Sequence, residues 1–142
     1  MALQSTKMEN SMSLKIPSIL ENIRIIESFI DNAKEQFQFS DDIYGNILIA
    51  VTESVNNAIL HGNGGNSDKN VYLTLEIDDA NICFTVEDEG PGFDYNTLPD
   101  PTAPENIDTM GGRGIFLMKH LADEVKFLED GRKVSLTFYM NQ

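Results

Sequence analysis

The 142-residue sequence has few cysteines, few positive charges and no long apolar run. Its single cysteine, Cys83, excludes an internal disulfide and a cysteine-rich metal site. No apolar run approaches the roughly 20 residues that a membrane-spanning helix needs. The polar start, residues 1–10, lacks the apolar stretch of a signal peptide. These absences predict a cytoplasmic protein in a reducing compartment, with no membrane segment.

Positive charge is scarce: the chain has 10 lysines and arginines but 23 aspartates and glutamates. Its formal net charge is therefore −13. Such a surface repels nucleic-acid phosphate, so direct binding of DNA or RNA is not expected. It also repels free ATP. A nucleotide site on this chain would therefore need a divalent cation and backbone N–H donors to offset the phosphate charge. The acidic surface either serves solubility alone or favours a basic partner.

Periodicity predicts a flexible tail over residues 1–11 and a single domain over residues 12–142. Apolar residues alternate, as in strands, over residues 12–16, 71–77, 82–86, 125–128 and 134–140. They recur at helical spacing over residues 18–37, 41–61 and 114–121. Helices on one face of a mainly antiparallel sheet make an α+β two-layer sandwich, which is the predicted fold class.

Local signals mark the ends of these elements. Ser18 and Glu21 have the spacing of a capping box for the first helix, and Ser40 is a candidate N-cap for the second. Residues 94–112 contain three prolines and no apolar period. Long loops of this kind in compact domains are often binding loops, so this segment is predicted to be a lid.

Asp88 is the residue that points most directly to a ligand. It continues the alternation of the strand over residues 82–86, so its carboxylate should face the core side of the sheet. A buried carboxylate needs a hydrogen-bond donor, and the exocyclic amine of adenine is a candidate. Gly90 and Gly92 would let the backbone approach a flat ligand. An aspartate before a glycine also caps ordinary turns, so both interpretations stay open here.

A glycine-rich segment, Gly111–Gly114, directly precedes the third predicted helix. A helix N-terminus presents free N–H groups and the positive end of the helix dipole to an anion. Arg113, inside this segment, could meet a phosphate. The segment could also serve as the hinge of the lid, and the two roles are compatible.

Glu53 and Asn57 lie one turn apart on the second predicted helix. An amide oxygen suits Mg²⁺, which prefers few protein ligands, and a nearby carboxylate suits a general base. Taken alone, the pair also fits a solvated helix face. His61 has no second histidine or cysteine at ligand spacing, so a helix-end histidine is the better interpretation.

Three motifs occur in the order of the N, G1 and G2 boxes of the Bergerat ATP-binding fold, which gyrase, sensor histidine kinases and MutL share. They are Glu53-x-x-x-Asn57-Ala58, Asp88-x-Gly90-x-Gly92 and Gly112-x-Gly114. Within that superfamily the chain resembles the anti-sigma factor serine kinases of bacteria, from about Met12 onward. The stretch from Asp100 to Asn106, followed by Gly111–Met118, is especially similar to that subgroup.

The resemblance implies a role for each motif. Asp88 would accept a hydrogen bond from the adenine amine, beside Gly90 and Gly92. Asn57 would bind the Mg²⁺ that bridges the phosphates, and Glu53 would be the general base toward a serine or threonine hydroxyl. The residues expected against the phosphates are Gly112, Arg113, Gly114 and Ile115.

The resemblance also implies ATP and Mg²⁺ as cofactors, and a homodimer that regulates a sigma factor by partner switching. The phosphorylated substrate would be a small antagonist protein, and Arg24 on the first helix would contact protein partners. The alternative is a non-catalytic ATP-binding module that controls another signalling partner. Relatives often carry threonine after the glycine of the last hairpin, whereas Arg132 follows Gly131 here, which leaves Asp88 as the main expected contact to adenine.

Overall fold

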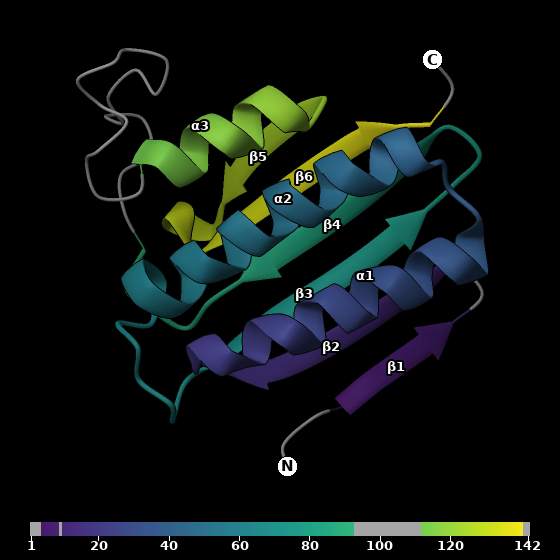
Figure 1. Cartoon of the computed structure of the whole chain (residues 1–142). Helices are drawn as coiled ribbons and strands as arrows, with labels where there is room; N and C mark the ends of the chain where they lie inside the picture. The colour runs from purple at the N-terminus through teal and green to yellow at the C-terminus, as the bar shows by residue number, and fades with distance from the viewer. Residues whose placement is uncertain (1–3, 9, 93–111, 141–142) are drawn as a thin grey trace.

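The computed structural model describes residues 4–8, 10–92 and 112–140. Six strands form one sheet in the order β1-β2-β3-β4-β6-β5, and every neighbouring pair is antiparallel. The strands are β1 Gln4–Met8, β2 Ser11–Pro17, β3 Asn70–Ile77, β4 Asn81–Glu87, β5 Glu124–Leu128 and β6 Lys133–Tyr139. The helices are α1 Ile23–Phe37, α2 Asp41–Asn57 and α3 Gly112–Leu121. All three cover the same face of the sheet, which confirms the α+β sandwich (Figure 1).

The core lies between the sheet and the helices. In β4 the side chains of Ile82, Phe84 and Val86 alternate with half-exposed neighbours and are buried against the helix layer. Buried side chains of α1 and α2 meet them from the other side. Alternation with a period of two therefore determines which face of each strand is covered, as the sequence predicts.

The central strands bring the end of β4 beside the turn between β5 and β6. Val86 is opposite Val134 in the ladder, and the N–H of Asp88 donates to the carbonyl of Arg132 at 2.9 Å. Asp88 is thus the first residue after β4 and is still tied to the neighbouring strand. This pairing positions the carboxylate at the sheet end that faces α2.

Gln4–Met8 forms β1, where the sequence predicted part of a flexible tail. The strand pairs with β2 in a register that joins Gln4 to Lys15 and Met8 to Ser11. Its sequence, QSTKM, has no apolar alternation, so periodicity cannot reveal it. Its strand conformation comes from the exposed backbone edge of β2, which is a tertiary effect.

The capping box predicted at Ser18 and Glu21 is wrong. Ser18 is buried, and its hydroxyl donates to the carbonyl of Lys69 at 2.8 Å and accepts from Asn63 Nδ2 at 2.7 Å. The first turn is a 3₁₀ turn, Leu20–Asn22, without a side-chain cap, and α1 begins at Ile23. These long-range hydrogen bonds of Ser18 replace the local one, because they satisfy buried polar groups.

The second helix begins as predicted and ends differently. Ser40 is its N-cap, and the Ser40 hydroxyl accepts from the N–H of Ile43 at 3.3 Å. After Asn57 the chain continues as a π turn, Ala58–Gly62. Such turns are rare and often occur at functional sites. No helix in the described parts of the chain is both long and apolar enough to cross a membrane.

Candidate functional site

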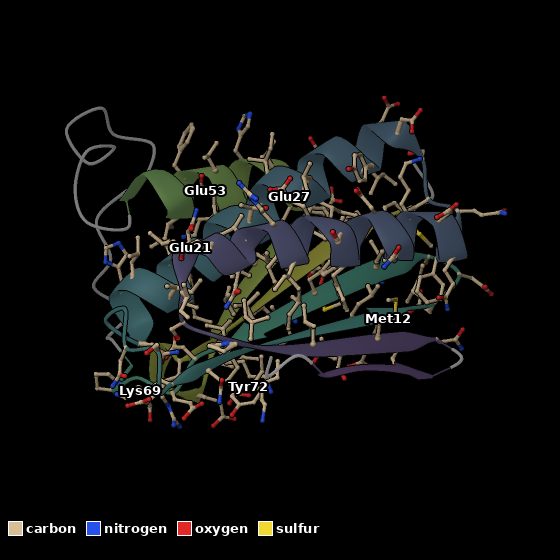
Figure 2. All side chains as sticks on the ribbon, turned by 60° about the horizontal axis from the view of Figure 1, so that its bottom comes forward. Met12, Glu21, Glu27, Glu53, Lys69 and Tyr72 are labelled. Carbon is tan, nitrogen blue, oxygen red and sulfur yellow. The ribbon has the colours of Figure 1, made fainter. Side chains whose placement is uncertain are left out.

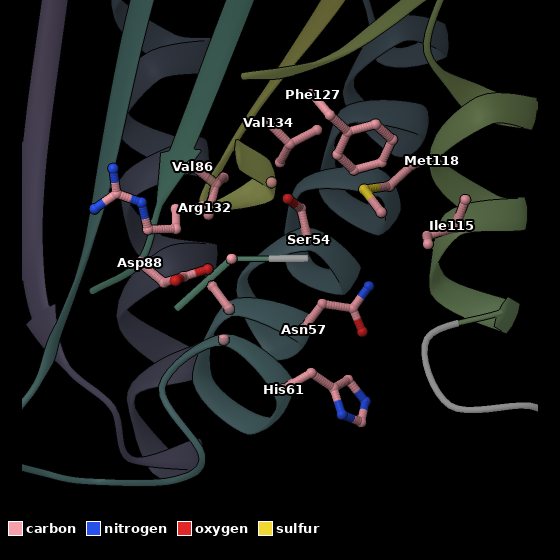
Figure 3. A pocket seen from close by; sticks show the side chains of 14 residues that line it. Ser54, Asn57, His61, Val86, Asp88, Ile115, Met118, Phe127, Arg132 and Val134 are labelled. Carbon is pink, nitrogen blue, oxygen red and sulfur yellow. The ribbon is translucent and has the colours of Figure 1, made fainter. Parts of the chain in front are cut away.

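A cavity of about 390 Å³ opens between α2, α3 and the strands β4, β5 and β6 (Figure 3). This volume lies in the range of small-molecule sites, roughly 300–1,000 Å³. Four segments line it, with residues Ser54, Asn57, Ala58, His61 and Gly62, then Val86, Asp88 and Gly92, then Ile115 and Met118, and finally Phe127, Gly131, Arg132 and Val134. Four of the residues predicted from sequence, Asn57, Asp88, Gly92 and Ile115, therefore line one cavity together with the β5–β6 hairpin.

The inner wall of the cavity is mostly apolar. Val86 and Val134 contribute from paired strands, and Met118 contributes from α3 on the opposite side. Side chains of this kind on two sides favour a flat, apolar ring between them. Asn57, His61 and Asp88 bring polar groups to the same cavity, so a ligand with one flat apolar part and one polar part fits it.

Of the two interpretations of Asp88 that the sequence left open, the turn cap is confirmed. Its Oδ1 accepts from the N–H of Gly90 at 2.8 Å, which closes the turn after β4. No residue in the described parts of the chain donates a hydrogen bond to Oδ2. Burial raises the pKa of the half-buried carboxyl, and the Gly90 N–H and the charge of Arg132 oppose this effect. Among the described residues, only one of the two carboxylate oxygens therefore has a hydrogen-bond donor.

Two glycines allow the backbone at the end of α2 to pack against the turn that holds Asp88. A Cβ on Gly90 would overlap the carbonyl oxygen of Gly62, and a Cβ on Gly62 would overlap Asp88 Oδ2. Gly90 does not itself line the cavity, whereas Gly92 does, with φ of +80°. The predicted close approach at Gly90 is thus an approach of backbone to backbone.

Gly90→Ala should lower the free energy of unfolding by about 1–3 kcal/mol and weaken any ligand that uses Asp88. The added methyl group must push the Gly62 backbone away, and overpacking of this kind is destabilising. Gly45→Ala is the matched control, because Gly45 lies in α2 with nothing within 4 Å of a Cβ. That control should stabilise by about 0.4–1 kcal/mol. Urea denaturation measures both, and equal effects would contradict the packing assigned to Gly90.

Asn57 connects α2 to the start of α3. A Cβ on Gly114 would come to 2.6 Å from Asn57 Nδ2, so the two residues are in close contact. Ile115, the next residue, is buried and lines the cavity, and α3 begins at Gly112. The predicted N and G2 residues are therefore adjacent. Gly111, the side chain of Arg113 and the predicted lid up to residue 111 lie outside the described residues.

Glu53 and Arg24 do not line the cavity. Glu53 is half-buried on α2, one turn before Asn57, and lies in the helix layer in Figure 2, whereas Tyr72 points from the opposite face of the sheet. Arg24 is exposed on the first turn of α1. Neither residue is part of the cavity wall.

Several cavity residues were not predicted as site residues. Phe127 and Val134 belong to strands whose place beside β4 depends on sheet order, which periodicity does not supply. His61 was expected only as a helix-end histidine, and Ser54 was not singled out, although both line the cavity. A signal existed for Ser54, since it lies between the two predicted residues of the N motif, Glu53 and Asn57.

Comparison with known proteins identifies the family. Residues 16–138 match the histidine kinase-like ATPase domain. The chain belongs to the histidine kinase-like ATPase family. It is 31% identical to the serine-protein kinase RsbW of Staphylococcus epidermidis, over 99% of this chain and 92% of that protein. It is 30% identical to RsbW of Staphylococcus aureus, over 94% and 89%. The resemblance to serine kinases of this family is thereby confirmed.

A solved structure supports the fold. The crystal structure of the RsbU and RsbW domains of Rv1364c from Mycobacterium tuberculosis superimposes with a TM-score of 0.64 at 14% identity, covering 91% of this chain and 31% of that chain. This likeness concerns the architecture. Together with the family membership, it places the described cavity in a histidine kinase-like ATPase fold.

The cavity residues fit a nucleotide with Mg²⁺. A free carboxylate oxygen on Asp88 and apolar walls suit a purine, and the N-terminus of α3 beside Asn57 suits phosphate. Within the described residues, no group of three or more His, Cys, Asp or Glu side chains could hold a metal ion. Mg²⁺ is commonly held by one or two protein oxygens together with phosphates, so Asn57 is a suitable single ligand.

Proposed function

We propose that this protein is an ATP-dependent serine/threonine kinase and anti-sigma factor that phosphorylates a small antagonist protein. The observation that carries the proposal is the meeting of Asp88, Asn57 and the start of α3 at one cavity. Relatives named serine-protein kinases that align over nearly the whole chain support it. Sigma-factor control by partner switching, a homodimer and contact of partners with Arg24 are parts of the same proposal.

In this proposal the site residues have distinct roles. Asp88 Oδ2 accepts a hydrogen bond from the adenine amine, while Oδ1 keeps its bond to Gly90. The N-terminal turn of α3 faces the phosphates, and Asn57 supplies an oxygen to Mg²⁺, which offsets phosphate charge when bound. Glu53 takes the proton of a substrate serine or threonine hydroxyl. The hydroxyl oxygen then bonds to the γ-phosphorus as the bond to the leaving ADP oxygen breaks.

The position of Glu53 fits a protein substrate. A general base must reach the hydroxyl that it deprotonates, and a side chain on a protein partner arrives from outside the nucleotide cavity. Glu53 is half-buried and outside the cavity wall, one turn from the proposed Mg²⁺ ligand. If no substrate hydroxyl can reach Glu53 at this position, the protein cannot transfer phosphate through it. The second candidate, a non-catalytic ATP-binding regulatory module, would then apply.

Phosphate transfer separates the two candidates. The purified protein is incubated with Mg²⁺ and ATP labelled at the γ-phosphate, together with the small partner recovered from the native host by pull-down. Label on a serine or threonine of that partner is the expected result. Tight ATP binding without transfer to any recovered partner would support the regulatory module, and absence of ATP binding would contradict both.

Asn57→Ala should weaken Mg²⁺-dependent ATP binding at least about tenfold, or about 1.4 kcal/mol. The loss should vanish when Mg²⁺ is removed with EDTA, because the amide is proposed to act through the metal. Asn56→Ala is the control, since Asn56 is a half-buried neighbour that does not line the cavity. Calorimetric titration with and without Mg²⁺ measures the effect. An equal loss in EDTA would assign Asn57 to packing against Gly114 instead.

A further inference from the structure

The hydroxyl of Ser54 is buried without a partner. Ser54 lies on α2 and is 2% exposed, and its Oγ has no hydrogen bond to any described residue. A serine inside a helix often bonds to the carbonyl one turn earlier, which Ser54 does not do. A buried hydroxyl without a partner lowers stability, so it needs a reason.

The location of this hydroxyl supplies a reason. Ser54 lines the cavity, and Figure 3 shows its hydroxyl pointing from α2 toward the strand side, where Val86 and Val134 lie. Its neighbours on that inner wall are apolar. Asp88, from the end of β4, brings the free oxygen Oδ2 to the same cavity. Asp88 can only accept hydrogen bonds when ionised, whereas the hydroxyl of Ser54 can also donate.

Adenine has the complementary pattern. Its exocyclic amine donates, and the ring nitrogens on either side of the amine accept. A carboxylate and a hydroxyl placed along this edge would satisfy both kinds of group. Guanine and hypoxanthine carry a carbonyl oxygen in place of the amine, and that oxygen would face the Asp88 carboxylate.

We propose that Ser54 is a second base-recognition residue, whose hydroxyl donates to a ring nitrogen of adenine beside the amine, directly or through one bound water. This inference rests on the proposed ATP site and names a further contact within it. The hydroxyl has no partner among the described residues and would gain one in the complex. Ser54 thus contributes to affinity at a cost to the stability of the free protein.

Ser54→Ala tests the proposal through two measurements, because the variant should bind ATP more weakly and yet be more stable without nucleotide. The dissociation constant for ATP should rise about 5- to 10-fold, the loss expected for one hydrogen bond. The melting temperature of the nucleotide-free protein should rise by about 2–4 °C, because an unsatisfied buried hydroxyl is removed. Thr52→Val is the matched control. Thr52 also has a buried hydroxyl on α2 without a partner among the described residues, but it does not line the cavity, so this change should leave ATP affinity unaltered.

Deaza analogues identify the bonded atom. 7-Deaza-ATP and 1-deaza-ATP each lack one of the ring nitrogens beside the amine. The wild-type protein should bind one of them about 5- to 10-fold more weakly than ATP, and Ser54→Ala should bind that analogue as well as the wild type does. If the analogue bound more weakly than ATP by the same factor in Ser54→Ala as in the wild type, the two changes would act independently. That result would overturn the proposed hydrogen bond.

The outcomes separate this proposal from the proposed function. Wild-type protein that binds ATP, with Ser54→Ala binding equally well, would overturn the Ser54 contact alone and would assign the serine to packing. Wild-type protein that fails to bind ATP would overturn the nucleotide site and the Ser54 contact together.

Discussion

Replacing Asp88 with asparagine should weaken ATP binding about 100-fold, or about 2.7 kcal/mol. The carboxylate has two oxygens: Oδ1 accepts from Gly90, and Oδ2, which has no donor among the described residues, is the proposed acceptor for the adenine amine. An asparagine side chain has one oxygen, so its NH₂ group must face either the Gly90 N–H or the adenine amine, donor against donor. Hydrogen bonds to a charged group contribute about 1.5–3 kcal/mol each. Calorimetric titration with ATP measures the loss.

Glu87→Gln controls for the loss of a negative charge at the end of β4. Glu87 is the preceding residue and points to the opposite face of the sheet, beside Tyr72, Thr85 and Lys133. This variant should bind ATP like the wild type. Similar affinities for the Asp88 and Glu87 variants would show that Asp88 contributes only general charge, and would remove it from the base contact.

Because the pKa of Asp88 is raised, the stability of the protein and its affinity for ATP should depend on pH in opposite directions. Burial raises that pKa above its ordinary value of 3.8, so the folded protein binds the proton more tightly than the unfolded chain. The resulting stability is fully present below 3.8 and is lost as pH rises through the raised pKa. ATP affinity should instead increase over this range, because the ionised carboxylate is the better acceptor. Asp88→Asn should remove both trends, which thermal denaturation and titration across pH would show.

Glu53→Gln should slow phosphate transfer to the antagonist protein about 10²- to 10⁴-fold, the usual contribution of a general base. ATP affinity should change less than about twofold, because Glu53 does not line the nucleotide cavity and glutamine keeps its shape. Initial rates with labelled ATP, together with ATP titration, measure the two effects separately.

Glu27→Gln is the control for Glu53, since Glu27 is an exposed carboxylate on α1, in the same helix layer (Figure 2). Its rate should equal that of the wild type. A wild-type rate in Glu53→Gln would reject Glu53 as the base. Equal losses of rate and of ATP affinity would instead indicate that Glu53 supports the position of Asn57.

The site was predictable from sequence where one element alone determines the geometry. Strand alternation predicts that Asp88 faces the helix side, and the structure places it in the cavity wall. Spacing by one turn predicts that Glu53 and Asn57 lie on one side of α2, yet only Asn57 lines the cavity. The difference arises because the direction of the cavity depends on where α3 packs against α2, which helical spacing does not determine.

Tertiary contacts explain the features that the sequence did not predict. The π turn at Ala58–Gly62 brings Gly62 against Gly90, and no local motif marks it. Ser18 lacks its predicted capping role because Lys69 and Asn63, distant in sequence, bind its hydroxyl. The unpartnered state of Ser54 depends on every neighbour around it. Each of these features requires knowledge of which segments meet.

The edge strand β1 affects how much unpaired strand backbone the sheet exposes to other chains. β2 buries Met12, Leu14 and Ile16 on one face, and its other neighbour in the sheet is β3. Without β1, the backbone donors and acceptors of this apolar strand would be open to pairing with another chain, a common route to aggregation. β1 is a short, polar strand that includes Lys7, and such edges discourage further pairing. A segment whose sequence predicts a flexible tail therefore covers the backbone edge of an apolar strand.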